Sequence, residues 1–220
     1  MQMKRIAAPR HYTIKRKVKK FTVFPKGPHK QTDGLALSIV IRDILNLVDT
    51  RKEVKKILNE GLILVDGKKR KDNYCVGFMD VVSIPSTKKY YRVSVDKRGL
   101  NLKEINKNEE NLKLARVKTI KNIKGGKYQL CLHDGKCIIT DKKYAPYTSL
   151  LIAVPDLEVK KSFDFGTGAL AIVFKGSHRG KVGKITKVEK DRVMLKGDEE
   201  FITSKKYVYV VGKEKEEIEL

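Results

Sequence analysis

This sequence has no apolar run long enough to cross a membrane, which takes roughly 20 consecutive apolar residues. Its first 17 residues, MQMKRIAAPRHYTIKRK, also lack the apolar centre of a secretion signal. Cysteine is rare and odd in number, with Cys75, Cys131 and Cys137. We therefore expect a cytoplasmic chain that has no membrane partner and keeps its thiols free.

The common catalytic motifs are absent as well. No HExxH, GxSxG or EF-hand loop occurs, and no histidine has a nucleophile, a base and an orienting acid near it in sequence. The four histidines are His11, His29, His133 and His178. These absences predict a protein that is not an enzyme and that uses no cofactor and no small-molecule substrate.

One short stretch, CLHDGKC, could be read as a metal motif. It brings Cys131, His133 and Cys137 close together. Structural zinc takes four ligands, however, and the chain holds no second ligand pair at suitable spacing. A hairpin turn at Asp134-Gly135, with the cysteines on the flanking strands, explains the same residues, so we expect no metal site.

Acidic residues are scarce, with 26 Asp and Glu against 49 Lys and Arg, which gives a formal charge of +23. Residues 1–30 contain ten Lys and Arg and no acid at all, whereas acids gather at 198–200 and in the last eight residues. Each phosphate that a cation neutralises releases condensed counterions. A polyanion such as nucleic acid is therefore the expected partner.

The first 35 residues form a basic arm with few periodic apolar positions and with Pro9, Pro25 and Pro28. Such a segment is expected to be extended or disordered on its own. It is either a solvated tail or an arm that orders on RNA, and the apolar Phe21, Val23 and Phe24 favour the second. Its candidate RNA contacts are Lys4, Arg5, Arg10, His11, Lys15, Arg16, Lys17, Lys19 and Lys20.

Residues 36–85 predict two helices and a hairpin. Apolar residues recur at three- and four-residue spacing from Leu37 to Val48, which is typical of a packed helix. Thr50 and Glu53 have capping-box spacing, and Gly61 ends the second helix. Beyond it, LILVDGKKRK predicts a strand, an Asp-Gly turn and a basic return strand, and FMDVVSIP predicts a further strand.

Cations cluster on the second helix and on the hairpin. If the hairpin folds beside the helix, the two sets form one concave positive surface; the alternative is a solvated helix face. The candidate contacts here are Arg51, Lys52, Lys55, Lys56, Lys68, Lys69, Arg70 and Lys71.

The segment from SIVIRDILNL to MDVVSIP resembles the alpha-L type RNA-binding domain first described in a small-subunit ribosomal protein. In that family the second helix and the following hairpin bind structured RNA. The resemblance implies an RNA-binding role for Arg42, Arg51, Lys55, Lys56, Lys68 and Arg70. The same module occurs in pseudouridine synthases, so it implies a ligand and not a function.

Residues 86–165 are expected to be β-rich, because YYRVSVD, YQLCLHDG and CIITD alternate and Gly125-Gly126 and Asp134-Gly135 predict turns. The exception that could form an amphipathic helix is LKEINKNEENLKLARVKTI, residues 102–120.

The glycine-rich stretch KGSHRGKVGKITKV, residues 175–188, looks at first like a phosphate loop. A Walker A loop needs four residues between its glycines, a Ser or Thr after the Lys, and a following helix. Gly176 and Gly180 are separated by three residues, Val182 replaces the hydroxyl, and a strand pattern follows. These differences exclude a nucleotide-binding loop.

The same stretch resembles the KOW motif of small SH3-like barrels in ribosomal proteins and transcription elongation factors. Glycine allows positive φ and close approach of a partner, so Gly176, Gly180 and Gly183 are expected to shape the loop. The candidate RNA contacts are Lys175, His178, Arg179, Lys181 and Lys184; the alternative is a structural turn that carries solvated cations.

Taken in order, KRIAAPRH, FTVFPKGPH, DGKKRKD, KYQLCLHDG and KGSHRGKVGKI resemble the archaeal and eukaryotic "e" family of S4-type small-subunit ribosomal proteins. The resemblance covers essentially the whole chain, and its length favours an archaeal type. It implies a structural constituent of the 30S subunit, located on the ribosome, that binds folded 16S-type ribosomal RNA beside neighbouring ribosomal proteins. The alternatives are an RNA-modifying enzyme of the pseudouridine synthase type and a KOW-bearing transcription factor.

The expected fold is a multi-domain α+β chain. We expect a basic arm (1–35), an alpha-L RNA-binding domain (36–85), a central β-rich domain (86–165), an SH3-like KOW barrel (166–212) and an acidic tail (213–220).

Overall fold

The computed structural model describes residues 3–213 and 217–219 and is mostly β, with few helices. It divides into two compact units, Met1–Ser94 with Arg98–Asn111 and Val95–Lys97 with Leu112–Leu220. Part of the predicted acidic tail, residues 214–216 and 220, lies outside the described residues. No helix in the described part is both long and apolar enough to span a bilayer.

The basic arm is folded onto the first unit. Strand β1 (Met3–Lys4) pairs with β2 (Phe21–Thr22) in an antiparallel ladder. The arm also buries four apolar side chains against the residues that follow it: Ala8, Tyr12, Ile14 and Val23. Within the whole chain the arm is therefore ordered, because its spaced apolar residues reach a core formed by residues later in the chain. That the segment is extended or disordered on its own stays a prediction.

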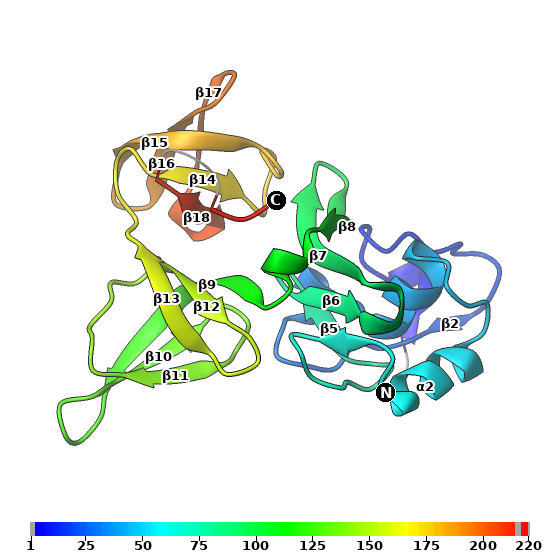
Figure 1. Ribbon diagram of the computed structural model, residues 1–220. Helices are drawn as coiled ribbons and strands as arrows, with labels where there is room; N and C mark the ends of the chain where they lie inside the picture. The colour runs from blue at the N-terminus through cyan, green and yellow to red at the C-terminus, as the bar shows by residue number, and fades with distance from the viewer. Residues whose placement is uncertain (1–2, 214–216, 220) are drawn as a thin grey trace. The chain divides into compact units, whose positions relative to one another are not determined.

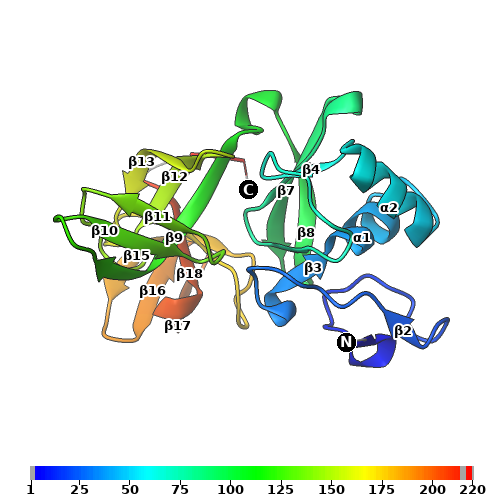
Figure 2. The same cartoon turned by 90° about the horizontal axis from the view of Figure 1, so that it is seen from below.

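The two predicted helices are present, and the second matches its prediction closely. Helix α1 (Leu37–Ile39) continues as a π-helical turn, η3 (Val40–Ile44), and ends sooner than the apolar pattern indicates, before Asn46 at φ 49°. Helix α2 (Arg51–Glu60) begins with the predicted capping box and ends at Gly61, which has φ 79°. Figure 2 shows α1 and α2 next to each other, and their buried side chains share one core.

Two small sheets complete the first unit (Figure 1). Strand β3 (Gly34–Ala36) pairs with β5 (Cys75–Gly77). The larger sheet has the order β4-β6-β7-β8. Its strands are β4 (Leu64–Val65), β6 (Val81–Ile84), β7 (Lys89–Asp96) and β8 (Gly99–Ile105).

The predicted Asp-Gly turn is confirmed, but the basic return strand predicted after it does not form. Asp66 and Gly67 both have positive φ, 50° and 70°, and Val65 and Lys68 exchange two backbone hydrogen bonds of 2.9 and 3.0 Å. This is the geometry of a type I′ turn. Beyond Lys68 the ladder stops and β4 pairs with β6 instead, because β6 is apolar and fully buried whereas residues 68–71 are cationic.

The sequence predicts a domain limit at residue 85, but β6 pairs directly with β7, so the first unit continues past it. After β8, the 3₁₀ turn η5 (Lys107–Glu109) closes the unit, where Glu109 accepts a 2.5 Å bond from the buried Arg92. Residues 102–120 thus form the end of β8, η5 and the start of β9. The prediction of a possible amphipathic helix there is wrong.

The second unit contains two five-stranded antiparallel sheets, with strand orders β11-β10-β9-β12-β13 and β17-β16-β15-β14-β18 (Figure 1). The first consists of β9 (Leu112–Asn122), β10 (Tyr128–Leu132), β11 (Cys137–Thr140), β12 (Ser149–Ala153) and β13 (Glu158–Phe163). The second consists of β14 (Leu170–Val173), β15 (Val182–Val188), β16 (Arg192–Lys196), β17 (Glu200–Ser204) and β18 (Val208–Gly212). The strands predicted within residues 86–165 are present, and residues 166–212, predicted as an SH3-like barrel, form a five-stranded antiparallel sheet.

Polar contacts link β9 to the C-terminal sheet. The guanidinium of Arg116 donates to the carbonyls of Lys206 and Val208 at 3.0 and 2.8 Å. It also lies over the rings of Tyr147, Phe174 and Tyr209. These contacts join the two sheets of the second unit.

Candidate RNA interface

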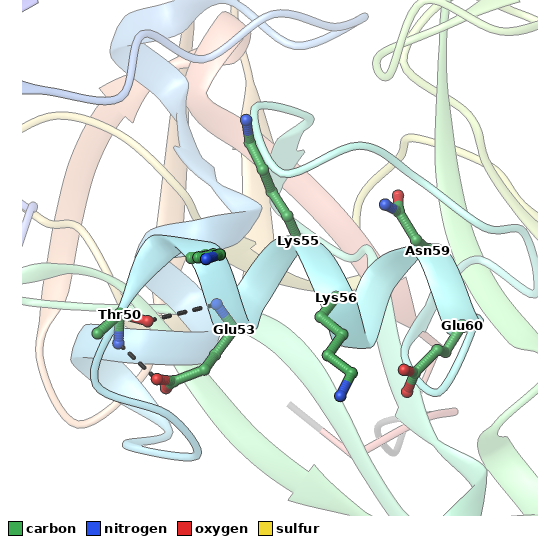
Figure 3. Close-up of a pocket in the computed structure, with 7 residues that line it drawn as sticks. Thr50, Glu53, Lys55, Lys56, Asn59 and Glu60 are labelled. Atoms are coloured by element: carbon green, nitrogen blue, oxygen red, sulfur yellow. Dashed lines mark hydrogen bonds between the residues drawn. The ribbon is translucent and has the colours of Figure 1, made fainter.

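The exposed side of α2 is cationic because the apolar residues of the helix all face the other way. Val54 and Leu58 are buried in the core of the first unit. Lys52, Lys55 and Lys56 are exposed, and in Figure 3 Lys55 and Lys56 extend on either side of the helix. A shallow groove along the helix is lined by Thr50, Lys52, Glu53, Lys55, Lys56, Asn59 and Glu60.

The acid in this groove, Glu53, is engaged by the backbone at the start of the helix. Its carboxylate accepts the backbone N–H groups of Asp49 and Thr50 at 3.2 and 3.3 Å, and its own N–H donates to the Thr50 hydroxyl (Figure 3). The hydroxyl and the backbone N–H of Thr50 lower the pKa of Glu53. The negative charge of Glu53 therefore stabilises the N-terminus of the helix.

Two contacts hold the basic segment Lys68–Lys71 beside α2. Near the N-terminal end of the helix, Arg51 lies 2.6 Å from Asp72. At the C-terminal end, the Lys69 ammonium donates to the carbonyl of Glu60 at 3.5 Å, and its side chain occupies the space where Gly61 would carry a Cβ. The expected juxtaposition of helix and hairpin cations is present, although the second half of the hairpin is a loop.

Five cations at this place are exposed and have no ion pair within residues 3–213 and 217–219. We call them the α2 surface: Lys52, Lys55, Lys56, Lys68 and Lys71. Lysines without an acid partner are point charges suited to phosphate groups. The α2 surface can therefore neutralise several neighbouring phosphates of a folded polynucleotide.

Like Arg51, the other two arginines that the resemblance implies as contacts already have partners in the free chain. Arg42 is half-buried and makes a two-bond contact with its neighbour Asp43, at 2.6 and 3.2 Å. The Cζ of Arg70 lies over the ring of Tyr74, 4.7 Å from its centroid, and the buried Nε of Arg70 has no hydrogen-bond partner among the described residues. Stacking fixes the direction of the Arg70 guanidinium beside the α2 surface.

The arm residues divide into structural and exposed cations. Arg5 is buried and donates to the carbonyls of Lys15 and Phe21, while Arg16 donates to the carbonyls of Arg5, Ile6, Ala8 and Pro9. His11 is half-buried and lies 3.2 Å from the Gly34 carbonyl. Of the predicted RNA contacts in the arm, those that stay exposed are Lys4, Arg10, Lys15, Lys17, Lys19 and Lys20.

The glycine-rich loop joins β14 to β15. Gly176 and Gly180 adopt positive φ, 99° and 79°. Gly183 does not; it lies within β15, where a Cβ would come within 3.0 Å of the backbone of Lys196 and Gly197. Two glycines thus permit the loop conformation, and the third permits close packing of strands.

The cations of this loop are packed to different degrees. His178 stacks on Phe201 with ring centroids 4.9 Å apart, and Lys181 lies over the same ring and 3.4 Å from Glu199. Arg179 and Lys175 are half-buried, whereas Lys184 on β15 is exposed. Among the predicted contacts of the loop, Lys184 is the most open to a ligand.

The CLHDGKC stretch forms a hairpin, as its Asp-Gly turn predicts. Cys131 and Cys137 are directly opposite each other on β10 and β11. His133 is turned toward β9, where its Nδ1 accepts the backbone N–H of Arg116 at 3.3 Å and its ring meets Tyr209. The three side chains therefore do not converge on one point.

Sequence reasoning missed two residues that shape the α2 surface. Asn59 lines the groove one turn beyond Lys55, and helical periodicity could have found it. Asp72 anchors the loop to Arg51 across 21 residues of sequence, and no local pattern indicates that contact.

Comparison with known proteins gives matches along the whole chain. The ribosomal family S4e matches residues 87–159, an RS4NT domain matches residues 2–32, and an S4 domain matches residues 39–82. A protein of Methanothermobacter thermautotrophicus named small ribosomal subunit protein eS4 is 38% identical, over 99% of this chain and 95% of that protein. The protein of the same name in Methanocaldococcus jannaschii is 39% identical, over 99% and 96%.

A solved structure is also similar. The crystal structure of the 30S ribosomal protein S4e from Thermoplasma acidophilum superposes with a TM-score of 0.72 at 34% identity. The match covers 82% of this chain and 96% of that one.

Proposed function

This chain belongs to the ribosomal family S4e, and from that membership we propose that it is a structural protein of the small ribosomal subunit that binds folded ribosomal RNA. The main support for the proposal is the share of the chain that is similar, since relatives named small ribosomal subunit protein eS4 match 99% of this chain. A shared single module would match only part of it. The role is structural rather than enzymatic.

The α2 surface supports RNA as the ligand. Its five lysines lie on two segments that Arg51–Asp72 and Lys69–Glu60 hold together, so the charges are positioned before the ligand arrives. Preorganised cations lose less freedom on binding than cations on a mobile tail. Phosphate contacts of this kind fix position and orientation, and they do not read sequence.

The exposed cations of the arm are further proposed RNA contacts of the first unit, and Lys184 of the glycine-rich stretch is a proposed contact of the second. We propose that residues 166–212 act as a KOW-type module, supported by the five-stranded sheet and the two positive-φ glycines of its loop. Arg5 and Arg16 contribute indirectly, because their bonds to backbone carbonyls hold the arm in shape. The partners would be small-subunit ribosomal RNA and neighbouring ribosomal proteins, on cytoplasmic ribosomes.

Salt-dependent binding tests the proposal. The purified chain is titrated with 16S-type ribosomal RNA at several salt concentrations, and the logarithm of the affinity should fall linearly with the logarithm of salt. A variant with Lys52, Lys55 and Lys56 changed to Ala should bind about tenfold more weakly, with a slope shallower by roughly 2 to 3.

A matched control separates the effect of the α2 surface on RNA binding from the effect of net charge. Lys118, Lys142 and Lys143 are exposed lysines of the second unit without an ion pair in the described part of the chain, and their triple Ala variant removes the same charge. Equal losses in the two variants would reject the α2 surface as the site. Failure of the tagged wild-type chain to sediment with washed 30S particles would reject the ribosomal role itself.

A further inference from the structure

Two cysteines face each other across the β10–β11 hairpin. Cys131 and Cys137 are paired in the ladder, and their Sγ atoms are 3.0 Å apart. The Leu132 N–H donates to the Lys136 carbonyl at 2.9 Å, so the next pair along, Cys131 with Cys137, is of the non-hydrogen-bonded type. Cα atoms in such pairs are about 4.5 Å apart, within the range of disulfides.

The pair is accessible, and the hairpin holds it in place. Cys137 is exposed and Cys131 half-buried, whereas Cys75, the third cysteine, is fully buried. The Asp134-Gly135 turn and three further ladder pairs of β10 with β11 fix the register. Rotation of the side chains alone can therefore bring the two sulfurs into bonding distance.

We propose that Cys131 and Cys137 form a reversible intrachain disulfide by exchange with a small-molecule disulfide of the glutathione type. The exposed Cys137 thiolate attacks one sulfur of the small molecule, forms a mixed disulfide and releases one small thiolate. Cys131 then attacks the Cys137 sulfur, the Cys131–Cys137 bond forms, and the second small thiolate leaves. The two cysteine protons pass to the two released thiolates; the protein loses two electrons and the small disulfide gains them.

The geometry also makes this disulfide easy to reduce. The ring closes over only the seven residues from Cys131 to Cys137, so it constrains the unfolded chain little. It is also open to an incoming thiol, and exposed disulfides are the labile ones. In a reducing compartment such a bond is transient and reports the thiol–disulfide balance.

The reaction should speed up with rising pH. The hydrogen bond with Cys131 raises the pKa of Cys137, so a smaller fraction of Cys137 is thiolate at neutral pH than in an isolated cysteine. Burial raises the pKa of Cys75 to about 12, so Cys75 is a built-in unreactive control.

Peptide mapping without reduction tests the proposal on the native full-length chain. After incubation with oxidised glutathione at mildly alkaline pH, we expect a Cys131–Cys137 crosslink, a mass loss of about 2 Da and an unmodified Cys75. Dithiothreitol should reverse the change. The single variants Cys131→Ser and Cys137→Ser should instead accumulate a glutathione adduct on the remaining hairpin cysteine.

Two results would overturn the proposal. One is stable glutathione adducts on both hairpin cysteines of the wild-type chain without a crosslink. The other is two hairpin thiols that remain reduced under conditions in which the serine variants form adducts. Either result would mean that the two sulfurs do not meet in the folded chain.

Discussion

The guanidinium of Arg51 lies 2.6 Å from the carboxylate of Asp72, and this contact holds a basic loop against the helix that precedes it. The Asp72 side chain is largely buried whereas that of Arg51 is half exposed, so the loop side of the contact is the fixed one. Three of the four residues just before Asp72 are exposed cations. The position of these positive charges thus depends on the negative charge of Asp72.

Asp72→Asn should weaken RNA binding although it removes a negative charge. Charge alone predicts tighter binding, because one repulsive carboxylate is lost. Loss of the contact with Arg51 releases the loop, and we expect roughly twofold to fivefold weaker binding, the range of a surface ion pair. Titration with ribosomal RNA at fixed salt measures the difference.

Glu60→Gln is the matched control for that change. The carbonyl of Glu60, and not its side chain, accepts the bond from Lys69, so the variant keeps the contact and removes the same charge. It should bind slightly more tightly than the wild type. If Asp72→Asn also binds more tightly, the loop does not need its anchor.

Local chemistry explains what could be predicted of α2 and the turn. The capping box of Thr50 and Glu53, the apolar stripe and Gly61 all act within one helix, so sequence spacing was sufficient to place both helix ends. The Asp66-Gly67 turn was equally local. The predicted return strand does not form because two segments compete to pair with β4. The apolar β6 pairs with it, and the cationic segment 68–71 does not.

The arm shows why the site could be predicted only in part. Arg5 and Lys4 are neighbours with the same charge, yet one is buried on backbone carbonyls and the other is exposed. A guanidinium has several donors in a fixed fork and can bind several carbonyls, and an ammonium on a flexible stem is suited to solvent. The pairing of β1 with β2 decides which cation of the arm reaches the backbone carbonyls. That pairing is a long-range contact, which local sequence does not indicate.

Arg116→Met should destabilise the second unit. The variant leaves the carbonyls of Lys206 and Val208 without their donor and removes the cation from three rings. We expect the free energy of unfolding to fall by about 2 to 4 kcal/mol. Urea unfolding followed by circular dichroism measures it, with Lys118→Met, an exposed cation of the same strand, as the control. A similar small effect in both variants would show that Arg116 does not join the sheets.

Acid should remove the stabilisation that Asp134 provides. Burial alone would raise the pKa of Asp134, but Lys113 at 2.9 Å, together with His133 and Lys136, holds it well below its usual range. Because the folded pKa is the lower one, the pair stabilises fully above the unfolded value and is lost as pH falls toward the folded one.

Asp134→Asn tests that pH dependence. At neutral pH the variant removes the carboxylate that lies 2.9 Å from the Lys113 ammonium, and unfolding should be easier by about 2 kcal/mol, the range of a hydrogen bond to a charged group. The gap to the wild type should narrow below about pH 4, where the wild type begins to lose the same contribution. Unfolding curves from pH 3 to 7 measure this, with the exposed Asp141→Asn as the control. A gap that stays constant over the range would mean that the charge of Asp134 is not what stabilises the fold.

Gly183→Ala and Gly125→Ala separate two reasons for glycine in this chain. Gly183 has an ordinary φ, but an added Cβ would lie 3.0 Å from three backbone atoms of Lys196 and Gly197, and backbone in a paired strand cannot move aside. Gly125 has φ 85° with open space around it, so its substitution costs only backbone strain. We expect losses of unfolding free energy of about 2 to 3 kcal/mol at Gly183 and about 1 kcal/mol at Gly125. The reverse order in urea unfolding would mean that β15 and β16 are not packed closely at this point, and that the third glycine of the loop stretch serves another purpose.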